Sequence, residues 1–231
     1  TGVQAYFHNI TIANSFPKTS FTLGSANNLG INCYGSWYMR NGVTVNDVVY
    51  FYSPTLGETI TSNNSVFSKN IHFRGAGGWT LQDKLTTGAH LYFNSGTLNT
   101  NSKEVYIGEN FLPDYYTYPV SPNNRHLIFG SSLIYALNEW SYPSGGTLDA
   151  GTSHITMRHG NGQFNAGDGY TYYDVTVNPT GNAQAIGYDF TGVNVNYHNV
   201  NIYSRFARFV NPNNTINRLY AMPTIGRLDL Y

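Results

Sequence analysis

A short plan of a turn followed by a strand recurs along this chain and limits the folds that it can adopt. In this plan Asn or Asp is followed by a β-branched residue, any residue and an apolar residue. It occurs, in places loosely, within residues 7–12, 45–50, 68–73, 172–177 and 197–202. Each copy is too short for a helix, and its alternation of apolar and other residues is typical of a half-buried strand.

The spacing of the copies favours stacked coils. The Asn or Asp residues at positions 9, 47, 70, 174 and 199 follow no strict period. Their separations suit coils of about 20 to 35 residues with variable loops, which is the range of β-solenoid repeats. In such a coil an Asn at the same turn of successive coils can form a hydrogen-bonded ladder. We therefore predict an all-β chain folded as a parallel β-solenoid. A β-sandwich is the alternative, because the same plan is a general signal for a turn before a strand.

Composition supports an all-β fold and excludes several classes of protein. The chain has only 4 Glu and 4 Lys, so ordinary helices would lack their charged outer faces. Its formal net charge is zero, which disfavours nucleic-acid binding through a basic patch. No run of apolar residues is long enough for a transmembrane helix. No linker interrupts residues 1–231, so we expect a single domain. Residues 131–140 are the one stretch that resembles a helix, and we expect a strand or a short irregular turn there.

Serial motifs within residues 65–203, and more thinly within residues 5–32, carry a resemblance to a family. The segments WTLQDKLTTGAHLYFNSGTLNTNSKEVYIG, LDAGTSHITM and FNAGDGYTYYDVTV follow one another in this order. They resemble the repeats of large adhesin-like surface proteins of Bacteroidetes-type bacteria. The resemblance implies a right-handed parallel β-helix, export to the cell surface and no catalytic motif. Because the chain starts at Thr1 without a Met or a signal-like stretch, we expect a processed or excised segment of a larger extracellular protein.

The residues that carry chemistry are dispersed. The 12 acidic residues form no D-x-D, D-D or E-x-E cluster, and the seven His show no metal-ligand spacing. We therefore expect no enzyme, no metal site and no cofactor, although acids from separate coils could still meet in space. Cys33 is expected to be a small core residue.

One aromatic loop is the sequence-based candidate for ligand binding. Asp114, Tyr115, Tyr116 and Tyr118 lie between Pro113 and Pro119. Tyrosine rings stack on sugars while their hydroxyls donate hydrogen bonds, and the prolines restrict the backbone. The tyrosines at positions 170, 172 and 173 are interpreted instead as packing residues.

Three functions remain open from the sequence. The first is a non-enzymatic extracellular domain for adhesion or assembly, with a glycan or cell-surface partner. The second is a β-helical polysaccharide lyase or glycoside hydrolase. The third is a subunit of an extracellular filament, which associates with further copies through the ends of the solenoid.

Overall fold

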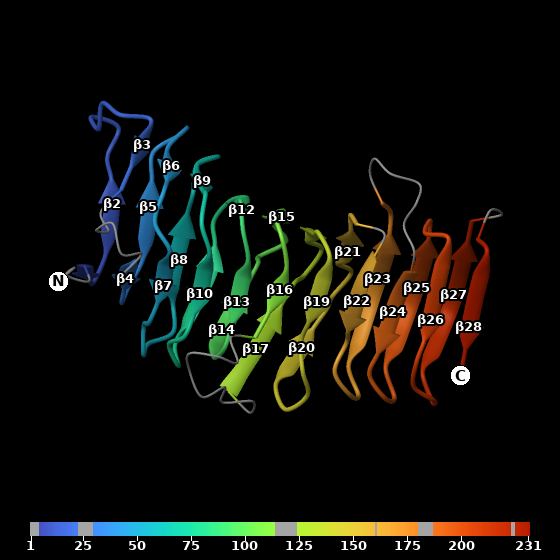
Figure 1. Cartoon of the computed structure of the whole chain (residues 1–231). Coiled ribbons are helices and arrows are strands. Elements are labelled where there is room, and N and C mark those ends of the chain that lie inside the picture. The colour runs from blue at the N-terminus through green and yellow to red at the C-terminus, as the bar shows by residue number, and fades with distance from the viewer. Residues whose placement is uncertain (1–4, 23–29, 114–123, 160, 180–186, 223–224) are drawn as a thin grey trace.

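The computed structural model is a parallel β-solenoid built from three sheets (Figure 1). It describes residues 5–22, 30–113, 124–159, 161–179, 187–222 and 225–231. Sheet A contains, in spatial order, β1 (Ala5–Phe7), β4 (Ile31–Cys33), β7 (Val49–Phe51), β10 (Ile71–Phe73), β13 (Leu91–Phe93), β16 (Phe111–Leu112), β19 (Glu139–Ser141), β22 (Asn161–Asn165), β24 (Gly187–Thr191), β26 (Phe206–Phe209) and β28 (Arg227–Leu230).

The other two sheets follow the same rule that each strand pairs with its counterpart one coil away. Sheet B contains β2 (Ile10–Ile12), β5 (Trp37–Met39), β8 (Glu58–Thr61), β11 (Gly78–Leu81), β14 (Gly96–Asn99), β17 (Arg125–Ile128) and β20 (Thr147–Asp149). Sheet C contains β3 (Ser20–Phe21), β6 (Thr44–Val45), β9 (Val66–Phe67), β12 (Leu85–Thr87), β15 (Val105–Ile107), β18 (Leu133–Ala136), β21 (His154–Met157), β23 (Thr171–Val177), β25 (Asn196–Ile202) and β27 (Thr215–Ala221).

Period-2 alternation fills the inside of the solenoid. In most of the short strands the first and third residues are buried and the middle one is partly exposed, as in β7, β13 and β15. Because the pairing is parallel and in register, each inward side chain lies against the equivalent side chain of the next coil. The inward residues therefore form continuous columns along the solenoid axis.

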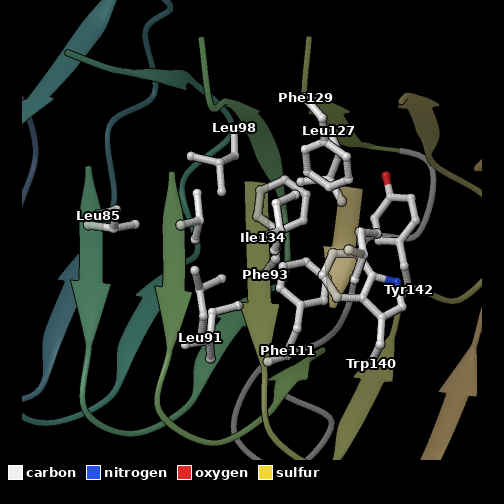
Figure 2. Close-up of a cluster of buried hydrophobic side chains, with 14 of the residues drawn as sticks. Leu85, Leu91, Phe93, Leu98, Phe111, Leu127, Phe129, Ile134, Trp140 and Tyr142 are labelled. Atoms are coloured by element: carbon white, nitrogen blue, oxygen red, sulfur yellow. The ribbon is translucent and has the colours of Figure 1, made fainter. Parts of the chain in front are cut away.

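The clearest of these columns is aromatic and belongs to sheet A. Trp140 is fully buried, and its ring stacks on Phe111 at a centroid distance of 4.2 Å and on Phe164 at 5.9 Å. The column continues to Phe190 and Phe209, whose rings stack at 4.5 Å. Figure 2 shows the centre of this core, where Phe111, Trp140 and Tyr142 face the aliphatic side chains of the other sheets.

Polar ladders hold the turns in place. The side chain of Asn70 accepts a hydrogen bond from the His90 backbone N–H, and the His90 ring accepts one from the Asn110 N–H. Asn110 in turn accepts one from the Glu139 N–H at 3.1 Å. Asn70, His90 and Asn110 thus each accept a hydrogen bond from the backbone of the next coil, which differs from the expected ladder of Asn side chains bonded to one another.

The cross-section of the solenoid changes after β20. In the earlier coils the chain passes through sheets A, B and C in turn, but sheet B ends with β20 among the described residues. From β22 onward the chain passes directly from sheet A to sheet C, and β23, β25 and β27 each have 7 residues instead of the earlier two to four. The early coils therefore consist of three separate short strands, and the later coils of two strands, of which the one in sheet C is long.

The structure confirms the predicted fold class and excludes the sandwich. Residues 131–140 contribute to β18 and β19, as expected. The described residues contain no helix that could cross a membrane. Cys33 is fully buried as predicted, and this burial raises the pKa of its thiol to about 11.

Candidate binding surface on sheet C

A bend at one position of β23, β25 and β27 creates a distinctive surface. In β23 the two successive residues Tyr173 and Asp174 are partly exposed between buried Tyr172 and Val175, which interrupts the alternation. The same interruption occurs in β25 and β27, and the three positions are in register. We define the corner surface as the outward residues of these strands: Tyr173, Asp174, Thr176, His198, Asn199, Asn201, Asn217, Arg218 and Tyr220.

The first two rows of the corner surface are fixed by contacts between their side chains. The Tyr173 ring stacks on His198 at 4.2 Å, with an interplanar angle of 16°. The amide nitrogen of Asn199 lies 2.5 Å from a carboxylate oxygen of Asp174 and 3.0 Å from Nδ1 of His198. An amide has two hydrogens to donate, so Asn199 can satisfy both acceptors. This arrangement sets the orientation of three side chains.

A second chain of contacts runs beside the first. His154 of β21 lies with Nε2 2.7 Å from Oγ1 of Thr176, and the amide of Asn201 donates to the same oxygen at 3.2 Å. Asn201 keeps its second amide hydrogen and its carbonyl oxygen for other partners. One ring nitrogen of each His and the Asp174 carboxylate thus face neighbours, whereas the Asn201 amide keeps unused hydrogen-bonding capacity.

The corner surface is hollowed in two adjoining places. The first depression has a volume of about 650 Å³ and lies where sheet B ends, between β20 and the starts of β23, β25 and β27. Asp149, Tyr173, His198 and Asn217 are among its lining residues. The second depression, of about 510 Å³, is lined by Asn199, Asn201, Arg218, Leu219 and Tyr220. Both depressions are open to solvent; the first has a mixed polar and apolar lining, and the second is mostly polar.

The loop predicted as the ligand site lies outside the described residues. This applies to Asp114, Tyr115, Tyr116 and Tyr118 alike, so their role stays a prediction. The interpretation of the next tyrosines as packing residues is confirmed for Tyr170 and Tyr172, which are buried. Tyr173, by contrast, lies on the corner surface.

The sequence contained a signal for the corner surface that its interpretation missed. Residues 172–177 and 197–202 share the turn-and-strand plan, and in the structure they lie in β23 and β25, which are in register. Residues 216–221 are the third copy, with Asn217 and Arg218 at the two outward positions. Three aligned copies of two adjacent polar residues between apolar ones indicate a bend that repeats in successive coils.

A second aromatic surface, on the outer face of sheet A, has a different geometry. The Tyr34 and Tyr52 rings stack at 5.6 Å, and the His72 and Tyr92 rings stack at 4.4 Å with an interplanar angle of 15°. The faces of stacked rings cover one another, so this ladder presents ring edges to its surroundings. Sugar binding by aromatic residues uses ring faces. The ladder therefore suits stabilisation of the stacked coils better than binding.

The described ranges contain no group of three or more His, Cys, Asp or Glu side chains placed to hold a metal ion. Comparisons of the chain with protein-family models, with curated proteins and with solved structures found no match.

Proposed function

We propose that this chain is a non-enzymatic adhesion domain of an extracellular surface protein and binds glycans at the corner surface. The observation that carries the proposal is the combination of aromatic, amide and guanidinium groups along two depressions on a rigid solenoid. A sugar presents hydroxyl groups at its rim and an apolar face, and it is bound by amides together with tyrosine rings. The resemblance to bacterial surface adhesins supports the extracellular setting.

The hydrogen-bonding state of the corner surface favours binding over catalysis. General acid–base catalysis needs a titratable group directed at the substrate. Asp174 and the Nδ1 of His198 face Asn199, and His154 faces Thr176. Asn201, Arg218 and Tyr220 keep unused hydrogen-bonding capacity, which suits them to recognition.

The other two functions remain alternatives. A lyase or hydrolase would need Asp174 or His198 to release its present partner and attack a bound polysaccharide. A filament would use the terminal strands: within the described residues β28 pairs only with β26, and Leu230 at its end is 60% exposed. Stacking on such an edge would complete hydrogen bonds of the sheet.

Replacing Tyr220 by Ala tests the proposed site. Tyr220 is 48% exposed, so its removal is expected to leave the stability of the fold nearly unchanged while lowering glycan affinity at least tenfold. Tyr38→Ala is the matched control, because Tyr38 is 40% exposed on sheet B, away from the corner surface. The measurement is binding to an array of neutral and acidic glycans, with product release recorded on the same samples.

Three results would contradict the proposal. Equal binding by Tyr220→Ala and the parent would remove the corner surface from the site. Loss of binding only in the triple variant Tyr115→Ala, Tyr116→Ala and Tyr118→Ala would place the site in the loop. Release of reducing ends or unsaturated products that stops in Asp174→Asn would establish the enzyme instead.

A further inference from the structure

We infer that the second depression selects uronic acid residues, with Arg218 binding the sugar carboxylate. This inference rests on the proposed glycan-binding function and specifies the class of glycan. It starts from Arg218, whose side chain is exposed on β27 and makes no hydrogen bond or ion pair with the described residues. Such a guanidinium presents a planar fork of N–H donors that matches a carboxylate in two parallel hydrogen bonds.

Two other arginines near the C-terminal end of the solenoid form ion pairs with carboxylates, and we interpret their role as structural. Arg208 lies 2.6 Å from Asp189, and Arg227 lies 2.8 Å from Asp229, both on the adjacent sheet A. Arg218 also points outward, but it lies on sheet C, where it is in register with Asn199 rather than with a carboxylate. The one acid in that row, Asp174, lies a further strand away and is bound by Asn199. The second depression therefore has a positive charge and no carboxylate among its lining residues.

The remaining lining groups fit the rest of a sugar ring. Tyr220 follows Arg218 by two residues in the strand, so the two side chains share one face about 7 Å apart. The ring of Tyr220 is tilted by 47° from that of Tyr203 at 5.6 Å, which leaves part of its face open. One pyranose with its carboxylate spans this distance.

Asn201 supplies hydrogen bonds to sugar hydroxyls. Its amide donates one hydrogen to Thr176, and its second amide hydrogen and its carbonyl oxygen remain for a ligand. Asn199 also lines the depression, and its amide nitrogen faces Asp174 and His198. An acidic peptide would satisfy Arg218 but would not need an amide beside an aromatic ring.

Isothermal titration calorimetry with matched oligosaccharides tests the inference. The probes are hexamers of galacturonate, of mannuronate and of glucuronate-containing hyaluronan, each beside its carboxyl-reduced form. At least one acidic hexamer is expected to bind tenfold or more tightly than its reduced form. Arg218→Gln is expected to remove this difference and to leave the reduced form bound as before. Lys69→Gln removes the same charge from an exposed turn between β9 and β10 and should change neither affinity.

The outcomes separate this inference from the proposed function. If neutral glycans bind through Tyr220 and Arg218→Gln changes nothing, the uronic acid assignment is wrong and the glycan function stands. If a sulfated dextran hexamer or an acidic peptide binds as tightly as the uronates, Arg218 recognises charge and the assignment is also wrong. If the parent binds no glycan at all, both the inference and the proposed function are wrong.

Discussion

Replacing Trp140 by Ala is expected to destabilise the solenoid by about 3–5 kcal/mol, the usual cost of removing a buried aromatic side chain. Trp140 is fully buried in the middle of the aromatic column, between Phe111 and Phe164. Its removal leaves a cavity between two coils, and the in-register pairing of β16, β19 and β22 limits how far the backbone can move to fill it. The measurement is urea denaturation followed by circular dichroism.

Leu133→Ala is the control for Trp140→Ala. Leu133 is 47% exposed on β18, so the loss of its side chain should lower the free energy of unfolding by less than about 1 kcal/mol. If Trp140→Ala were as mild as this control, the aromatic column would not be the core of these coils.

Gly96→Ala is expected to cost roughly 2–5 kcal/mol through two separate effects. Gly96 has a φ of +84°, which L residues adopt only with strain. A Cβ there would also lie 2.5 Å from the carbonyl oxygens of Gly75 and Gly77. Those oxygens belong to the preceding coil and are fixed by its turn, so they cannot retreat without opening the contact between coils.

Gly42→Ala separates the two effects. Gly42 also has a positive φ, +72°, but a Cβ would meet no atom within 4 Å. The change in unfolded-state entropy is the same in both variants, so their difference measures the clash alone. Gly42→Ala is expected to cost about 1 kcal/mol. Equal melting temperatures for the two variants would show that the coils do not approach each other as closely as described.

The solenoid could be predicted from the sequence because its strands and turns are encoded by patterns of only a few residues. Alternation in three-residue strands and Asn or Gly at the corners are visible without knowing which coil pairs with which. The copies at Asn9 and Asn70, however, lie at different turns of the coil, because Asn9 precedes β2 of sheet B and Asn70 precedes β10 of sheet A. Their similarity therefore reflects a shared local conformation rather than the coil repeat. Only Asp174 and Asn199 among the recognised positions are partners in adjacent strands.

The corner surface could not be predicted because it depends on where sheet B stops. No residue near β20 signals that the next coil will pass directly from sheet A to sheet C. Once the three long strands are aligned, Tyr173, His198 and Asn217 occupy equivalent positions, and so do Asp174, Asn199 and Arg218. The residues of such a surface belong to successive coils and lie about 20 to 25 residues apart in the sequence. A short motif of clustered acids therefore does not reveal it.

Chemical-shift mapping of the backbone amides tests most directly the claim that the corner surface binds a glycan. The 15N-labelled chain would be titrated with the tightest-binding oligosaccharide from the array. The account predicts that the largest shift changes lie in β25 and β27, around Asn199, Asn201 and Arg218, and that the strands of sheet B before β20 stay unchanged. Shift changes confined to sheet A, to the loop with Tyr115 or to the terminal strand β1 would contradict it.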